Sequence, residues 1–423
     1  MPGRSGDRLA VSTRRVHGER VAYSDPRTSD AERAAAGRET VAQRFRALLP
    51  ANREHAAAQY AEGGLPDGQE AARVWFPRDP AALAERLGDQ PLTAWADDGI
   101  LHVLWRGDAE VAMLAGGLQL PLWPVQADAS HRPGADAPGL WEASVRVRRL
   151  DEAVLTVTVA AARHDEPLSG RLMGAPVVFR GRAAPADPAP GPLAGELREH
   201  MLESTALGGP RGVTVYLPPG LSGGSPAPGC VLADGQSAAG FAPALDAAIR
   251  AGTAPPVVLA GVHNAHVHAP DRPRPPRADL RALEYLPRLR SRRFAAHMAF
   301  VTGEVIPWAA GQFPVAPGPW TAAGFSNGAV WAIAAGQRRP EVFGRVAALS
   351  AGMAPRRIAG RSRQARHYLG AGTLEGGFRG ATSEWAGRLQ RAGLPCAYQE
   401  WAGGHDPWWW RQVLPAALAW LLG

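Results

Sequence analysis

The sequence predicts an α/β domain with a mainly parallel sheet, preceded by a small β-sandwich domain. After residue 195, short apolar runs alternate with helix-like stretches, the pattern of a sheet covered on both faces. Between residues 71 and 182, strand-like runs follow one another without helices, as in a β-sandwich. The Pro/Ala-rich segment 183–194 separates these two textures and is expected to be a linker.

The segment before the sandwich, residues 1–70, is expected to be a polar arm followed by a helix, and to be partly disordered. Ser29 and Glu32 form an N-cap pattern ahead of an Ala-rich stretch. The α/β domain is then expected to cover residues 195–423. A chain of 423 residues is long enough for this two-domain arrangement.

Residue periodicity places the elements in order along the chain. Strands of the sandwich are expected at 72–76, 100–105, 110–114, 140–147, 153–160 and 176–180. Strands of the α/β domain are expected at 212–217, 230–233, 257–262, 320–324, 346–350, 367–370 and 397–400. Helices are expected at 242–251, 294–308, 328–338, 384–392 and 409–422.

Composition excludes several classes of protein. No apolar run is long enough to span a membrane, and the Arg-rich N-terminus lacks a secretory signal, so we expect a cytoplasmic protein with no membrane partner. All 46 basic Lys and Arg positions are arginine, which excludes Schiff-base lysine chemistry and lysine-dependent phosphate loops. The net charge of +7 is scattered along the chain, so no nucleic-acid partner is expected.

We expect neither a metal ion nor a cofactor. Cys230 and Cys396 each lie in an apolar strand-like run and are expected to be buried free thiols. His263, His266 and His268 could bind zinc, but no nearby acid or fourth ligand completes a recognisable site. Histidines on a loop at the mouth of a pocket are the simpler interpretation.

Ser326 is the candidate nucleophile. It lies in a G-x-S-x-G pattern, residues 324–328, between a predicted strand and a predicted amphipathic helix. Small residues on either side let the strand turn abruptly into the helix, which projects the serine from the carboxyl edge of the sheet. Because a serine hydroxyl is a poor nucleophile at neutral pH, a base must accept its proton.

His405 is the candidate base, because it follows the last predicted strand and precedes the final Trp-rich helix. Gly403 and Gly404 are expected to leave room for its imidazole to swing toward the serine.

A carboxylate should orient the imidazole, and it should lie between the serine and the histidine in chain order. Glu375, on the loop after the strand at 367–370, fits this position. Asp406, next to the base, and Glu384, on a predicted helix, are the fallbacks. A Ser–His dyad without a firm third member is the alternative mechanism.

An oxyanion hole needs two backbone N–H donors. Asn327, the residue after the nucleophile, is expected to supply one of them. Gln236, with Gly235 as its neighbour, is expected to supply the other, since both follow the strand at 230–233.

With these residues in place, the sequence resembles the enterochelin (enterobactin) esterase family, within the esterase D-like α/β-hydrolases. The resemblance extends from about residue 70 to the C-terminus. It rests on the motifs RGVTVYLP at 211–218, DGQ at 234–236, RALEYLP at 281–287, GFSNG at 324–328, PEVFG at 340–344 and GHD at 404–406. It implies an α/β-hydrolase domain preceded by an immunoglobulin-like β-sandwich, in which LWRG at 104–107 and LW at 140–141 carry the similarity.

The resemblance also implies a function. It implies cytoplasmic hydrolysis of the ester bonds of a catecholate siderophore trilactone, with release of its iron, and it gives Ser326, Glu375 and His405 their catalytic roles.

A ferric tris-catecholate is a multiply charged anion, which favours guanidinium groups around its pocket. Arg281, Arg356, Arg357 and Trp408 are the candidate substrate-binding residues. The alternatives are an ordinary solvated surface and, for Arg281, an ion pair with Glu284 that fixes its loop.

Three functions remain open at this point. The first is an esterase for a small-molecule ester, a ferric siderophore among them. The second is a carboxylesterase or acyltransferase that acts on another small or sugar-linked ester. The third is an inactive binding protein with a hydrolase fold. The sequence does not indicate an oligomeric state.

Overall fold

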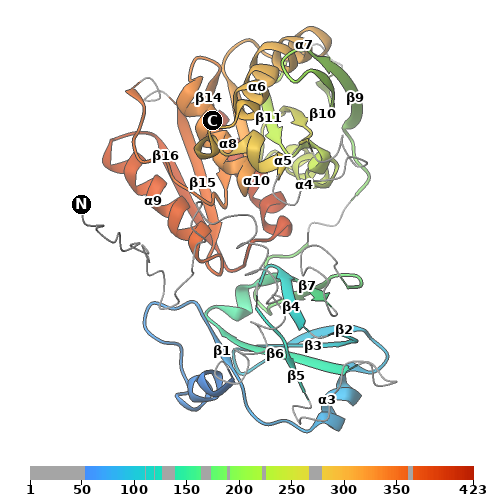
Figure 1. Cartoon of the computed structure of the whole chain (residues 1–423). Coiled ribbons are helices and arrows are strands. Elements are labelled where there is room, and N and C mark those ends of the chain that lie inside the picture. Colours follow the sequence, from blue (N-terminus) through green and yellow to red (C-terminus); the bar gives the residue numbers. More distant parts are fainter. Residues whose placement is uncertain are drawn as a thin grey trace, which may run out of the picture.

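The computed structural model describes residues 53–109, 111–118, 120–125, 139–162, 173–187, 191–221, 225–265, 279–360 and 365–423. The predicted N-terminal arm with its capping pattern, and the zinc candidates His266 and His268, lie outside these ranges. Figure 1 shows two parts, one built mainly from strands with short helices beside them and one built from a sheet with helices.

The first part, which we call the β-unit (residues 71–180), contains two antiparallel sheets. One has the order β1-β6-β3-β2, with β5 beside β6, and the other has the order β4-β7-β8. Side chains from both sheets, Trp105, Leu114 and Val157 among them, form one buried core. Two sheets around one core are thus present, whereas an immunoglobulin-like topology remains a prediction. The strands are β1 (Ala71–Val74), β2 (Leu92–Asp97), β3 (Ile100–Gly107), β4 (Val111–Gly116), β5 (Trp123–Pro124), β6 (Gly139–Val147), β7 (Val154–Ala162) and β8 (Val177–Arg180).

Sequence patterning missed the strands β2 and β5 of the β-unit and its helix α3 (Pro80–Leu87). The helix has a clear start signal, because the Asp79 side chain accepts a hydrogen bond from the Ala81 N–H and Pro80 occupies the first turn. Its short length gave too little periodicity to separate it from the surrounding strands.

The second part, which we call the α/β-unit (residues 196–422), is built on an eight-stranded mixed sheet in the order β16-β15-β14-β13-β11-β12-β10-β9. From β12 to β16 the neighbouring strands run parallel, and β10 is antiparallel to both β12 and β9. The strands are β9 (Glu196–Ser204), β10 (Gly209–Leu217), β11 (Gly229–Ala233), β12 (Val258–Val262), β13 (Trp320–Phe325), β14 (Phe343–Leu349), β15 (Arg366–Gly372) and β16 (Cys396–Trp401).

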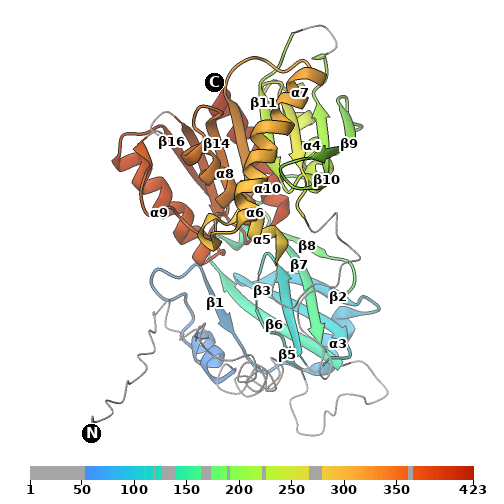
Figure 2. The same cartoon turned by 45° about the horizontal axis from the view of Figure 1, so that its top comes forward.

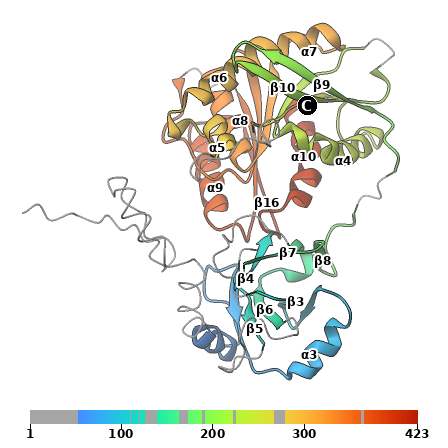
Figure 3. The same cartoon turned by 45° about the vertical axis from the view of Figure 1, so that its right-hand side comes forward.

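Helices cover both faces of this sheet, as Figure 3 shows. One core lies under α4 and α10 and includes Phe241 and Leu414, and the other lies under α5, α6, α8 and α9 and includes Phe294 and Trp385. Successive residues of a strand point into opposite cores, because side chains alternate between the two faces of a sheet. In β11, for example, Cys230 belongs to the core under α4 and α10, and Val231 belongs to the other core. The helices are α4 (Ala238–Arg250), α5 (Leu280–Tyr285), α6 (Arg292–Phe300), α7 (Ile306–Gln312), α8 (Asn327–Arg338), α9 (Gly377–Arg391) and α10 (Pro407–Leu422).

The helix predicted at 294–308 is present as a continuous helical stretch that contains a π-helical turn. Helix α6 is followed by a π-helical turn, Val301–Val305, and then by α7. Pro307 lies at the start of α7, and because it has no N–H it cannot donate a regular helical hydrogen bond. No helix among the described residues is long and apolar enough to cross a membrane.

Sequence patterning also missed β9, the edge strand. Its residues are mostly polar and only alternate ones are partly buried, because an edge strand here presents one side to solvent. The parallel strands were recognisable because they are apolar on both faces.

Candidate active site

Ser326 stands at the turn between β13 and α8, in a backbone conformation that non-glycine residues rarely adopt. Its φ is 56° and its ψ is −125°. A Cβ on Gly324 would lie 2.4 Å from the Gly328 backbone, and one on Gly328 would lie 3.0 Å from Ala233. The two glycines are therefore required by close contact, and the strained turn holds the serine at the carboxyl end of β13.

The loops after β15 and β16 bring the candidate acid to the candidate base. Nδ1 of His405 lies 3.0 Å from Oε2 of Glu375. The Leu374 N–H donates to the Gly403 carbonyl, and this bond joins the two loops next to the side chains. Neither fallback takes the place of Glu375: the Asp406 side chain points to other partners, and Glu384 pairs with Arg388 on the surface of α9.

The Glu375 carboxyl group is fully buried and hydrogen-bonded on both oxygens. Oε1 accepts hydrogen bonds from Ser350 Oγ and from the Gly372 N–H, each at 2.7 Å. Ser350 Oγ in turn accepts a hydrogen bond from Trp410 Nε1 at 2.8 Å. These donors fix the carboxyl group so that Oε2 faces the imidazole.

Trp410 contacts both His405 and Phe325, the residue before Ser326. Its ring lies edge-on to His405, with centroids 4.7 Å apart, and stacks on Phe325 at 4.6 Å. Among the contacts of the described residues, the imidazole has no hydrogen bond to Ser326 Oγ. In enzymes without substrate, such a bond is often loose and tightens in the complex.

The predicted oxyanion donors lie at neighbouring strand ends. Asn327 begins α8, and Gly235 and Gln236 belong to the short helical turn Gly235–Ser237 after β11. Strand β11 pairs with β13 in parallel, so both turns leave the same edge of the sheet. The first N–H groups of a helical turn have no partner within it, which leaves these donors available for a ligand.

Asp234 fixes the turn that carries Gly235 and Gln236. Its carboxyl group accepts two hydrogen bonds from Arg281 at 2.7 Å and one from Asn264 at 2.8 Å. The predicted pairing of Arg281 with Glu284 is wrong, because Glu284 pairs with Arg211 instead. The Arg281 guanidinium is thus engaged with the turn after β11, and its role toward substrate stays a prediction.

The other predicted substrate-binding residues have partners other than His405 among the described contacts. Arg356 lines a cavity of about 470 Å³ beside α8, and Arg357 is exposed on the same loop. Trp408 donates from Nε1 to Asp187 at 2.8 Å, and the Arg180 guanidinium lies over its ring. The structure places Trp410, not Trp408, against the base. Binding of substrate by Arg356, Arg357 and Trp408 remains a prediction.

The β-unit meets the α/β-unit at the histidine loop. The space that Gly403 and Gly404 were expected to leave for the imidazole is filled: a Cβ on Gly404 would lie 1.4 Å from the Gly117 carbonyl oxygen, and one on Gly403 would lie 2.3 Å from Trp409. Gly404 therefore allows the two units to touch, and Gly403 allows the loop to pack against α10. Figure 2 shows the β-unit below the edge of the sheet from which this loop leaves.

Asp406 connects this loop to the β-unit. It accepts hydrogen bonds from the Thr156 N–H at 2.6 Å, from Thr156 Oγ1 at 3.0 Å and from the Trp408 N–H at 2.9 Å. The last bond caps α10. The residue beside the base is therefore an anchor between the two units.

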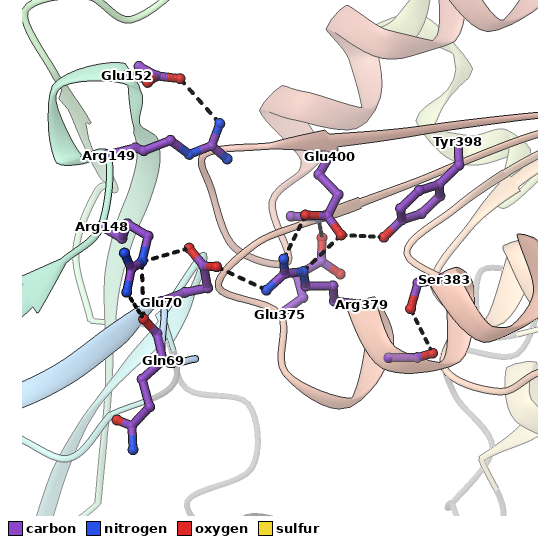
Figure 4. A network of polar contacts seen from close by, with 12 residues as sticks. Gln69, Glu70, Arg148, Arg149, Glu152, Glu375, Arg379, Ser383, Tyr398 and Glu400 are labelled. Atoms are coloured by element: carbon purple, nitrogen blue, oxygen red, sulfur yellow. Dashed lines mark hydrogen bonds and ion pairs between the residues drawn. The ribbon is translucent and has the colours of Figure 1, made fainter. Parts of the chain in front are cut away.

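A second contact between the units lies beside the acid loop (Figure 4). Arg379 on α9 bonds both Glu400 and Glu70, the latter at 3.2 Å across the interface. Glu70 is also 3.9 Å from Arg148 of the β-unit, and Tyr398 donates to Glu400. Partly exposed ion pairs contribute little to stability individually, but several of them in a network help to hold the two units in one relative position.

Sequence reasoning missed Ser350 and Phe378, which contact the acid and the base. The Phe378 ring lies 4.1 Å from the His405 ring. Ser350 has a φ of 57°, an uncommon conformation that no sequence pattern indicated. Among the described residues, no group of histidine, cysteine and carboxylate side chains could hold a metal ion.

The chain belongs to the esterase family, since the family model described as "Putative esterase" matches residues 204–421, just over half of the sequence. No curated protein matches the chain.

Solved structures of enterochelin esterases share the fold. The enterochelin esterase of Shigella flexneri is 16% identical with a TM-score of 0.59, over 80% of this chain and 97% of that one. The ferric enterobactin esterase of Salmonella typhimurium is 17% identical with a TM-score of 0.57, over 81% of this chain and 98% of that one. At these identities the comparison establishes the fold.

Proposed function

We propose that the chain is a serine esterase of the α/β-hydrolase fold, with Ser326 as nucleophile, His405 as base and Glu375 as the acid that orients it. The observation that carries this proposal is the 3.0 Å contact between His405 Nδ1 and Glu375 Oε2, beside a serine in a strained strand-to-helix turn. The order of these residues along the chain also supports it. Ser326 follows β13, Glu375 follows β15 and His405 follows β16, all strands of one sheet. Serine, acid and histidine occur in this order in α/β-hydrolases.

In this mechanism, His405 Nε2 takes the proton of Ser326 as Oγ attacks the ester carbonyl carbon. The N–H groups of Asn327 and of Gln236 or Gly235 stabilise the negative charge that develops on the carbonyl oxygen. The alkoxide leaves with the proton from His405, and a water molecule activated by the same imidazole then hydrolyses the acyl-enzyme. Glu375 keeps Nδ1 protonated and stabilises the imidazolium, as the buried carboxylate does in such triads.

For the substrate, we propose an ester of a catecholate siderophore, and with it a cytoplasmic location. The support is the shared fold with the Shigella flexneri enzyme, whose structure was determined in the presence of enterobactin. Fold alone does not fix substrate, so this part of the proposal depends on direct assay.

The test is mass spectrometry of products from ferric enterobactin, with 4-nitrophenyl acetate as a parallel substrate and Ser326→Ala as the inactive control. We expect linear 2,3-dihydroxybenzoyl-serine fragments whose formation depends on Ser326. Rapid hydrolysis of the nitrophenyl ester with intact trilactone would rule out the siderophore and retain the esterase.

A further inference from the structure

A cavity of about 280 Å³ lies between the two units, against the catalytic base. The β-unit contributes Arg73, Leu118 and Val145 to its walls, and the α/β-unit contributes Leu374, Phe378 and His405. The walls are therefore largely apolar, and the charged or titratable residues among them are His405, Arg73 and Glu375, whose side chain is fully buried. A pocket of this kind binds an apolar body with a few polar groups placed to orient it.

Arg73 is held in place by contacts that leave its charge uncompensated. Its guanidinium lies over the Trp123 ring at 3.6 Å, and Nη2 donates to the Pro121 carbonyl at 2.7 Å. Nε is buried without a hydrogen-bond partner, and no carboxylate among the described residues pairs with this side chain. Burial lowers the pKa of Arg73 to about 10, so the group remains charged at neutral pH.

A guanidinium removed from water without an acid partner is costly, and a bound anion offsets that cost. The contrast with Arg281 is informative, because Asp234 already neutralises that residue. Arg73 has donors left over, and it lines the same cavity as Leu374 and Phe378.

We propose that this cavity binds the anionic end of the ester substrate, an apolar or aromatic group that bears a negative charge, such as a carboxylate or an iron-bound catecholate, with Arg73 as its counter-ion. This inference deepens the proposed esterase function and rests on it for the identity of the ligand as substrate. It makes the β-unit part of the binding site, so that specificity is divided between the two units.

The first experiment measures binding without turnover. Isothermal titration of the Ser326→Ala protein with 4-hydroxybenzoate and with the neutral 4-hydroxybenzamide isolates the effect of charge on one shape. We expect the carboxylate to bind 10- to 100-fold more tightly, on the order of a charge-assisted hydrogen bond. Adding Arg73→Met should remove this preference, and Arg73→Lys should restore part of it. Equal binding of the two probes, or a preference that survives Arg73→Met, would overturn the proposal.

The second experiment measures kcat/KM for 4-nitrophenyl acetate, 4-nitrophenyl hemisuccinate and 4-acetoxybenzoate. The last two carry the charge on the acyl and alcohol sides, respectively. Arg73→Met should lower kcat/KM about 10- to 100-fold for at least one anionic ester and leave the neutral ester within about twofold. Arg106→Met is the matched control, because within the described part of the chain the Arg106 guanidinium bonds only the Gly88 carbonyl. An equal loss for all three esters would contradict the proposal. No turnover of any ester would contradict the esterase function alone, since the titration decides the role of Arg73 separately.

Discussion

Glu375 is a buried carboxyl group whose partners all lie within hydrogen-bonding distance. Ser350 Oγ and the Gly372 N–H hold one oxygen and His405 Nδ1 faces the other. Preorganised donors of this kind fix the imidazole in one tautomer and one orientation, so that its Nε2 is the nitrogen available to the serine.

Replacing Glu375 with Gln should lower kcat by about 10³- to 10⁴-fold, because the amide can present an N–H to Nδ1 and favour the wrong tautomer. Steady-state kinetics with a nitrophenyl ester measures the effect. Glu384→Gln is the matched control and should be nearly neutral, since Glu384 is exposed and pairs only with Arg388. Full activity in Glu375→Gln would instead indicate a Ser–His dyad.

At the scale of elements, the turn from β13 to α8 depends on small residues for two separate reasons. Ser326 adopts a strained backbone, and the neighbouring glycines allow the strand and the helix to approach within contact. The sheet supports the strain, because β13 is paired on both sides by parallel strands.

Gly324→Ala should destabilise the protein by roughly 2 kcal/mol or more, because its Cβ would overlap backbone atoms of Gly328. Urea unfolding measures the change. Gly311→Ala in α7 is the control: nothing lies within 4 Å of its added Cβ, so it should be neutral or stabilising by up to about 1 kcal/mol. Equal effects of the two substitutions would show that the turn is not tightly packed.

At the scale of the whole molecule, the β-unit supports the histidine loop. Asp406, directly after the base, accepts two hydrogen bonds from Thr156, and the Trp409 indole donates to the Val154 carbonyl. Strand β7 thus fixes the loop from outside the α/β-unit. Orientation of the base then depends on the contact between the units.

Thr156→Val keeps the shape of the side chain but removes one hydrogen bond to Asp406. We expect a loss of about 1–3 kcal/mol in stability and a fall in kcat of severalfold, because the buried Asp406 carboxylate, next to His405, loses one of its three donors. Thr253→Val, at an exposed threonine after α4, is the control. Unchanged kcat in Thr156→Val, with the expected loss of stability, would show that the contact between the units does not position the base.

Stability should also fall at acidic pH because of buried histidines. His297 is fully buried with no hydrogen-bond partner on either ring nitrogen among the described residues, and burial lowers its pKa to about 4. The unfolded chain binds a proton below its pKa of about 6.5 and the folded protein does not, so stability decreases as pH falls from 6.5 toward 4.

Between pH 7.5 and pH 5, His297 should lower the free energy of unfolding by roughly 2 kcal/mol. Urea unfolding of the parent and of His297→Phe at the two pH values measures it. The variant should lose less stability on acidification by about this amount. Identical losses in both proteins would contradict the assignment, because the other buried histidines, His102 and His367, are common to both.

Much of the α/β-unit could be predicted from the sequence, because its central strands are apolar on both faces and its helices are amphipathic. The pattern around Ser326 and the order of Glu375 and His405 indicated the site for the same reason: each follows a recognisable strand. Three features could not be predicted in this way: the edge strand β9, the π-helical turn before Pro307, and the part of the site that the β-unit forms. They depend on contacts between distant segments, such as Gly404 with Gly117, that no local pattern records.

The most direct test of the proposed catalytic role of Ser326 is covalent labelling with a fluorophosphonate, followed by mass spectrometry of the intact protein and its peptides. We predict one label in the parent protein, on the peptide that contains Ser326, and none in Ser326→Ala. Labelling should be slow in His405→Ala and normal in the control Ser383→Ala. A folded parent protein that takes no label, or a label that persists in Ser326→Ala, would contradict it.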